Sequence, residues 1–143
     1  MGKVLVTGGS GFIGSNFVRM LLRETDAEVV NLDLLTYAGN PANLKDAEGN
    51  KNYSFIKGDI ADKKTAEKAL EGVDTVFSFA AESHVDNSIK DSNAFVHTNV
   101  LGTKNMVECA MKANVERFVQ VSTDEVYGSV EKGSSKETDR LEP

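Results

Sequence analysis

The 143-residue sequence predicts an α/β fold in which helices cover both faces of a parallel sheet. Two observations support this class. Short apolar segments alternate along the chain with segments of helical periodicity. A glycine-rich turn, TGGSGFIGS, also follows the first apolar segment directly. The length suits about one domain.

The first half of the chain is expected to contain three strands, over residues 3–7, 28–33 and 53–57. Between the first two, a helix is predicted over residues 12–24, with one face made of Ile13, Phe17, Met20 and Leu21. Residues 34–52 are rich in Gly, Asn and Pro, so this stretch is predicted to be mostly loop, with one helical turn near Pro41.

The second half is expected to add two strands, over residues 75–79 and 116–122. Asp62 is predicted to cap a helix that ends near Leu70, before Gly72. A long helix over residues 93–113 is expected to bury Val96, Val100, Val107 and Ala110. After Gly128 the chain is polar and shows no period.

Right-handed crossovers between these elements give the strand order 3-2-1-4-5, a doubly wound, Rossmann-like sheet. Its ligand crevice lies at the carboxyl ends of the first and fourth strands. The glycines of the turn, Gly8, Gly11 and Gly14, suit a dinucleotide pyrophosphate at the start of the following helix. A tight strand-to-helix turn without a ligand is the alternative, and the flanking strand and helix favour the binding role.

Asp33 ends the second strand, about 20 residues after the last glycine. In dinucleotide-binding units, an acidic residue at this distance holds the adenosine ribose. Its charge would repel a 2′-phosphate, which favours NAD over NADP. A carboxylate that caps the loop is the alternative. Asp59 and Ile60 follow the third strand and could hold the adenine amino group and pack on its ring, although Asp also caps helices and Asp62 could do that here.

Charge and composition exclude several other classes of partner. The net charge of −6 argues against nucleic acid and against an anionic membrane surface. No apolar run approaches the ~20 residues of a membrane span, and no secretory signal is evident. The single Cys109 suits a cytoplasmic setting, and two histidines with one cysteine are too few for a structural metal site.

Two polar clusters follow the fourth and fifth strands. In FAAESHVDNS, a Ser/His/Asp hydrolase triad is disfavoured because the residues are sequence neighbours without a nucleophile elbow, so His84 is expected to be a loop histidine. In STDEVYG, Asp124 and Glu125 could act as an acid and a base at the mouth of the crevice. A solvated acidic turn would explain the same residues.

The motifs TGGSGFIGS, GDI, AAESHVD and VSTDEVYG together resemble the extended short-chain dehydrogenase/reductase family, in particular its nucleotide-sugar-modifying members. LDLLTYAGN and STDEVYG are similar to the branch that dehydrates dTDP-glucose. The resemblance implies that NAD takes a hydride from the sugar C4, that water leaves across C5 and C6, and that the hydride returns to C6.

By this resemblance, Thr123 hydrogen-bonds the sugar near O4, Asp124 is the acid for the C6 hydroxyl and Glu125 is the base at C5. It also implies contacts with NAD from Phe12, Ile13, Asp33, Leu34, Leu35, Thr36, Asp59, Ile60, Phe79, Ala80, Ala81, Glu82, Ser83 and Thr98. Ser83 is also expected to lie near the substrate.

The family's hydride step requires a Tyr-x-x-x-Lys pair on a helix after STDEVYG, and the chain ends at Pro143. Residues 1–143 are therefore expected to form an incomplete NAD-binding domain that lacks the C-terminal substrate domain and has no turnover alone. Tyr53 and Lys57 match the spacing, but four residues of a strand span roughly 13 Å, which is too far for joint action.

The complete enzyme is expected to be a homodimer, because the long helix carries apolar surface that a partner subunit covers in this family. A related epimerase or decarboxylase, and an NAD-binding fragment without catalysis, remain the alternative functions.

Overall fold

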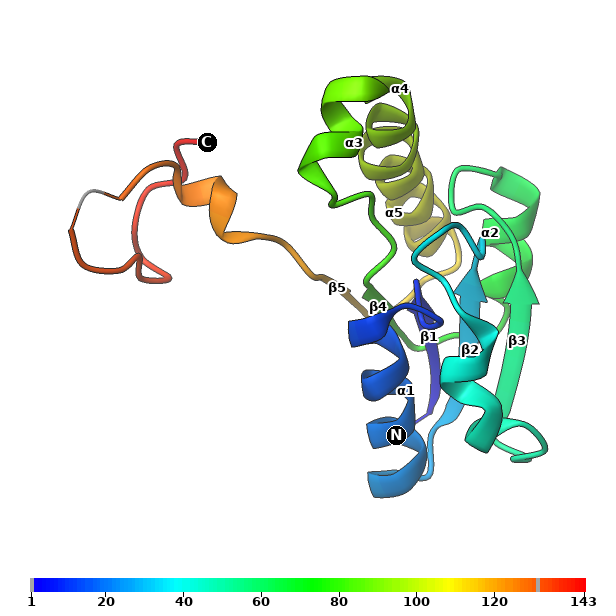
Figure 1. Cartoon of the computed structure of the whole chain (residues 1–143). Helices are drawn as coiled ribbons and strands as arrows, with labels where there is room; N and C mark the ends of the chain where they lie inside the picture. The colour runs from blue at the N-terminus through cyan, green and yellow to red at the C-terminus, as the bar shows by residue number, and fades with distance from the viewer. Residues whose placement is uncertain (1, 131) are drawn as a thin grey trace.

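The computed structural model describes residues 2–130 and 132–143, and in this part of the chain five parallel strands form one sheet. The strands are β1 (Lys3–Thr7), β2 (Glu28–Asp33), β3 (Tyr53–Lys57), β4 (Thr75–Ser78) and β5 (Arg117–Gln120). Their order is β3-β2-β1-β4-β5, and every neighbouring pair is parallel. The predicted doubly wound sheet and its strand order are confirmed (Figure 1).

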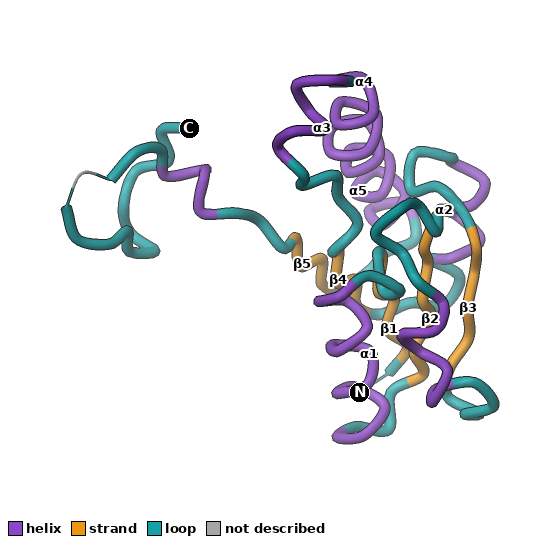
Figure 2. The backbone as a smooth tube through the Cα atoms, viewed as in Figure 1, coloured by secondary structure: helices purple, strands orange, loops and turns teal. Residues whose placement is uncertain are grey.

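Helices cover both faces of this sheet (Figures 1 and 2). They are α1 (Phe12–Glu24), α2 (Lys63–Ala69), α3 (Val85–Lys90), α4 (Ser92–Phe95) and α5 (Thr103–Lys112). Shorter helical segments are η1 (Pro41–Ala47) and η3 (Asp124–Tyr127), both 3₁₀, and η2 (Val96–Gly102), which is π-helical.

The core consists of two hydrophobic clusters, one on each face of the sheet. Alternation along β1 supplies both, since Leu5 faces α2 and α5 whereas Val4 and Val6 face α1 and η1. These three side chains are fully buried. Burial of each such side chain contributes about 1.5–3 kcal/mol to stability.

Helix α1 has its predicted bounds, but its buried face differs from the expected one. Leu21 is buried as expected and packs with Val18, whereas Phe17 and Met20 are half-buried and Ile13 is 64% exposed. The reason is that the first turn of α1 opens on the ligand crevice, so Ile13 lines the crevice instead of the sheet.

The predicted helix over residues 93–113 is observed, but three of its expected core residues are not buried. Ala110 is buried, together with Met106 and Cys109, whereas Val96, Val100 and Val107 are exposed. The helix carries apolar side chains on two faces, and α5 packs on the sheet through the Met106 face. Helix α3, which precedes it, was not predicted from the sequence.

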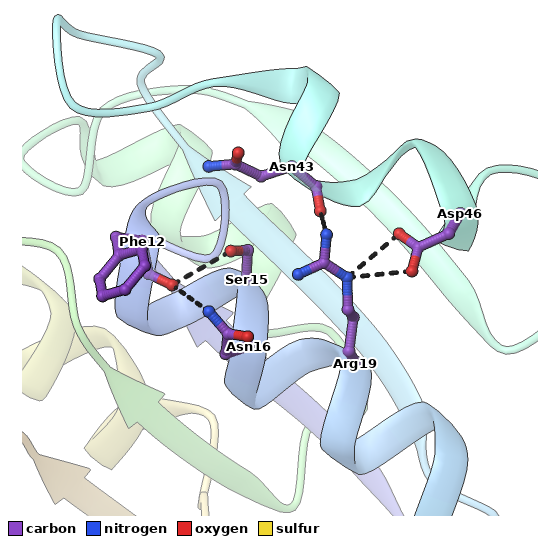
Figure 3. Close-up of polar contacts among 6 residues, drawn as sticks. All are labelled: Phe12, Ser15, Asn16, Arg19, Asn43 and Asp46. Carbon is purple, nitrogen blue, oxygen red and sulfur yellow. Dashed lines mark hydrogen bonds and ion pairs between the residues drawn. The ribbon is translucent and has the colours of Figure 1, made fainter.

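The segment between β2 and β3 is more ordered than the single helical turn expected near Pro41. Pro41 begins η1, and the Asn40 side chain caps it by accepting from the Ala42 N–H at 3.0 Å. Arg19 of α1 holds η1 by donating from Nε to the Asp46 carboxylate at 3.0 Å and from its guanidinium to the Asn43 carbonyl (Figure 3). This segment is therefore fixed against the helix that begins at the glycine turn.

Beyond β5 the chain leaves the sheet, and η3 and the residues after it lie to one side of the domain (Figure 1). Across residues 2–130 and 132–143, no helix combines the length and the apolarity that a membrane crossing requires.

Candidate functional site

A pocket of about 550 Å³ lies at the carboxyl ends of the strands, at the predicted crevice. This volume lies within the usual range of small-molecule sites. Every cofactor-site residue predicted from the sequence lines the pocket except Leu35. The lining residues that were not predicted are Leu32, Ala38, Gly39, Gly58, Val121 and Ser122.

The glycine turn between β1 and α1 forms the floor of the pocket. Gly8 has a φ of +69°, and a Cβ there would lie 2.7 Å from the Ala80 backbone nitrogen. A Cβ at Gly14 would collide with the Gly8 carbonyl oxygen. No side chain caps the N-terminus of α1, and its first turn has no acidic residue, so its N–H groups can serve a bound anion.

Ser10 fixes the shape of this turn and is 1% exposed. Its N–H donates to Asp33 Oδ2 at 2.9 Å, and its hydroxyl accepts from Asn31 Nδ2 at 3.1 Å. Its carbonyl accepts from the Asn40 N–H and from Asn43 Nδ2. The turn is thereby tied both to β2 and to the segment that follows β2.

Asp33 lies at the end of β2, is 7% exposed and lines the pocket. Its second oxygen, Oδ1, accepts from the Leu35 N–H at 2.8 Å. The carboxylate therefore caps the loop, as the alternative interpretation has it, and it also lines the pocket, where the ribose contact stays a prediction. A carboxylate has about four acceptor positions, so two ribose hydroxyls can still donate to it.

Leu35 is the exception among the predicted cofactor residues. Its backbone has a φ of +59°, in the left-handed region, and its N–H donates to Asp33. Its half-buried side chain does not line the pocket.

Asp59 and Ile60 line the pocket at the end of β3. Asp59 accepts from the Ala61 N–H at 2.8 Å through Oδ1, and Oδ2 lies 2.9 Å from His97 Nε2. The cap of α2 is Asp62, which accepts from the Thr65 N–H at 2.8 Å. Asp59 therefore does not cap α2.

The loop after β4 forms the opposite wall, and residues 79–83 line the pocket there. The Glu82 backbone donates to Asn99 Oδ1 and accepts from Asn99 Nδ2, both at 2.8 Å. The Tyr37 hydroxyl, from the segment after β2, donates to Glu82 Oε2 at 3.0 Å. This last bond joins loops from the two sides of β1.

The acidic pair of STDEVYG does not reach the pocket. Thr123 lines it, and the Thr123 hydroxyl accepts from the Glu125 N–H at 3.0 Å to begin η3. Asp124 and Glu125 are exposed in η3, outside the lining, because the chain departs from the sheet after β5. The structure thus brings together Ser83 and Thr123, but not the two carboxyl groups.

The remaining candidates lie outside the pocket lining. His84 is exposed in the loop before α3, as expected. Tyr53 and Lys57 occupy the two ends of β3, and Tyr53 accepts a hydrogen bond from Asn31 Nδ2. Burial raises the pKa of the Tyr53 phenol, which disfavours its use as a base. Among the described side chains, no three His, Cys, Asp or Glu residues are arranged to hold a metal ion.

This chain is similar in fold to solved structures and similar in sequence to other proteins. DesIV, a dTDP-glucose 4,6-dehydratase from Streptomyces venezuelae solved with NAD bound, is 51% identical with a TM-score of 0.93, over 99% of this chain and 45% of that one. The low-salt glycan biosynthesis protein Agl12 of Haloferax volcanii is 50% identical over 98% of this chain and 45% of its own length.

A dTDP-glucose 4,6-dehydratase of Streptomyces griseus is also 50% identical, over 98% of this chain and 43% of its own length. The chain thus spans less than half the length of these relatives. The profile of the GDP-mannose 4,6 dehydratase family matches residues 5–143. The resemblance to nucleotide-sugar dehydratases is confirmed, and the chain belongs to the GDP-mannose 4,6 dehydratase family.

Proposed function

We propose that this chain forms the NAD-binding part of a nucleotide-sugar 4,6-dehydratase that acts on dTDP-glucose. The observation that carries the proposal is the pocket itself, which joins the glycine turn, the buried Asp33 and the Thr123 of STDEVYG. Several relatives that share this part of the chain are dTDP-glucose 4,6-dehydratases, and one of these is solved with NAD bound.

The residues of the pocket fit NAD along its whole length. The adenosine would lie at the ends of β2 and β3, beside Asp33, Asp59 and Ile60. The pyrophosphate would lie on the glycine turn at the start of α1, where backbone N–H groups are available. The nicotinamide would lie beside residues 79–83, Thr98 and the start of the segment after β5.

Asp33 supports a preference for NAD over NADP. Its carboxylate is buried and held from two sides by backbone N–H groups, so it cannot turn away from a ligand. A 2′-phosphate on the adenosine ribose would place a second negative charge against it, and like charges in a partly desolvated site repel strongly.

The dehydration would use the residues that follow β5. When bound, NAD supplies the hydride acceptor at C4 and the hydride donor at C6. Thr123 would hydrogen-bond the sugar near O4, with Ser83 beside it. Glu125 would take the C5 proton while Asp124 gives a proton to the departing C6 hydroxyl, so that one water molecule leaves. Both carboxyls are exposed in η3 and would act on a sugar that extends beyond the pocket.

The whole enzyme would be a cytoplasmic homodimer. Val96, Val100 and Val107 are exposed on one helix, and an apolar face of this kind favours association. Cys109 is free and buried, which suits a reducing compartment. A monomeric whole enzyme in light scattering would contradict the dimer.

The first experiment is a calorimetric titration of the chain with NAD and, separately, with NADP. We expect NAD to bind more tightly, and the Asp33→Ala variant to lose most of that affinity. Asp26→Ala, which removes an exposed carboxylate from the loop between α1 and β2, is the matched control and should bind as wild type does. Equal or tighter binding of NADP, or no binding of NAD, would overturn the cofactor assignment.

The dehydration chemistry is tested separately in the whole enzyme. The Glu125→Gln substitution removes the proposed base, so exchange of the C5 hydrogen with solvent should fall by about 100-fold or more. Because Glu125 lies outside the pocket, NAD affinity should remain unchanged. Undiminished exchange would rule out Glu125 as the base.

A further inference from the structure

The π-helical segment η2 directs three consecutive side chains toward the pocket or its walls. His97 contacts Asp59 after β3, Thr98 lines the pocket, and Asn99 holds the Glu82 backbone after β4. Three consecutive residues of an α-helix spread over about 200° of its circumference. The wider π-turn, with its i→i+5 bonds, reduces that spread. The geometry of η2 therefore allows all three side chains to serve one site.

Thr98 lines the pocket directly, and Asn99 holds the loop after β4. His97 does neither. It does not line the pocket, and its ring reaches the Asp59 carboxylate from outside, with Nε2 2.9 Å from Oδ2. The other oxygen, Oδ1, is held by the Ala61 N–H. Asp59 is thus fixed at both oxygens while its carboxylate still borders the pocket.

A carboxylate held in this way can recognise a hydrogen-bond donor at one defined position. Each oxygen of Asp59 can accept a second hydrogen bond. The Ala61 N–H and the His97 ring set the plane of the carboxylate, and therefore the direction of the acceptor positions that remain. An adenine presents a 6-amino donor at this end of the pocket, whereas a hypoxanthine presents a 6-oxo acceptor there.

We propose that His97 is a positioning residue that orients Asp59 toward the adenine 6-amino group and so sets the base specificity of the site. This inference rests on the proposed binding of NAD. The contact requires a hydrogen on Nε2, which both the imidazolium and one neutral tautomer of histidine carry.

The test compares NAD with nicotinamide hypoxanthine dinucleotide, in which a 6-oxo group replaces the 6-amino group of the base and N1 carries a hydrogen. The chain is titrated with each dinucleotide by calorimetry, and the readout is the ratio of the two dissociation constants. We expect the wild-type chain to prefer NAD. His97→Ala should reduce this preference by about two- to tenfold, the range for the loss of one hydrogen bond, by weakening NAD and leaving the hypoxanthine analogue nearly unaffected.

Two further variants distinguish a loss of Asp59 orientation from a general loss of folded structure. His97→Gln keeps an N–H that can donate to Asp59 and should recover most of the preference. Lys104→Ala removes an exposed ion pair with Glu108 on the same helix, away from the pocket lining, and should retain the wild-type ratio. Melting temperatures of all variants are measured in parallel.

The outcomes distinguish this inference from the proposed function. If the wild-type chain binds neither dinucleotide, the NAD assignment itself fails. If it binds NAD and His97→Ala weakens both dinucleotides by the same factor, His97 has only a structural role and the inference is overturned. A wild-type ratio of one would also overturn it, because Asp59 would then not recognise the 6-amino group.

Discussion

Single side chains in this site act mainly by holding backbone in place. The side chains of Asp33, Asn43 and Asn99 each hydrogen-bond a main-chain group of another segment. A bond of this kind contributes about 0.5–1.5 kcal/mol, and leaving a buried partner unsatisfied costs more. The pocket is therefore preorganised by residues whose side chains are already engaged before any ligand binds.

Tyr37 offers the clearest test at this scale, because its hydroxyl donates to Glu82 across the top of β1. Tyr37→Phe removes that bond but keeps the ring. Since the two loops would then separate more easily, we expect NAD to dissociate faster and its affinity to fall by about two- to tenfold. Stopped-flow release of NAD measures the rate.

The matched control for this prediction is Tyr127→Phe, the same change in η3 and outside the pocket lining. It should leave the release rate unchanged. Equal effects of the two substitutions would show that the Tyr37–Glu82 bond does not retain the cofactor.

The sequence predicted the residues whose roles depend on spacing along one segment. Gly8, Gly14 and Asp33 belong to this group, since a tight turn and an acid about 20 residues later define the motif. His97 and Asn99 could not be predicted, because their contacts depend on the π-turn of η2 and on loops at Asp59 and Glu82 that are distant in the sequence.

Among the elements, α2 depends most visibly on a single residue. Asp62 caps it by accepting from the Thr65 N–H, and hydrogen bonding to Thr65 lowers the pKa of the Asp62 carboxyl. A carboxylate whose pKa is lower in the folded chain stabilises that chain above its unfolded pKa of about 3.9. The contribution is lost as the pH falls through the folded pKa.

Asp62→Ala should therefore lower the melting temperature by several degrees at neutral pH. The difference from wild type should persist from about pH 7 down to about pH 5 and shrink below about pH 4, where the wild-type carboxyl becomes protonated. Thermal unfolding followed by circular dichroism across this range checks the sign. Asp26→Ala, which removes an exposed carboxylate outside any cap, should show no such dependence, and a difference that grows in acid would contradict the role of Asp62.

Helices with strong signals at both ends were predicted to within one residue of their observed bounds. Helix α1 (Phe12–Glu24) follows the glycine turn, and α2 lies between the Asp62 cap and Gly72. Helix α3 was missed because its six residues are too few to show a helical period in the sequence. The prediction of which face is buried was wrong for the helix after residue 92. This helix carries two apolar stripes, one with Val100 and one with Met106, and only the packing against the sheet shows that the Met106 stripe is the buried one.

At the scale of the molecule, one sheet separates the two hydrophobic clusters, and β1 contributes to both. Leu5 belongs to the cluster with α2 and α5, and Leu21 of α1 belongs to the other. Hydrogen bonds of the central strand with β2 and β4 join the two faces. This arrangement predicts that neither face unfolds without the other.

Leu5→Ala and Leu21→Ala test this prediction, since each removes the same atoms from one face. Both leucines are 3% exposed or less, so each change should cost about 2–5 kcal/mol.

Burial raises the pKa of the Cys109 thiol, so its alkylation reports opening of the α5 face. With Tyr37 and Tyr127 changed to Phe, fluorescence of Tyr53 reports the opposite face, where that ring packs. If the sheet couples the faces, both probes should give one urea midpoint in either variant. A variant that shifts only the probe on its own face would show that the two clusters unfold independently.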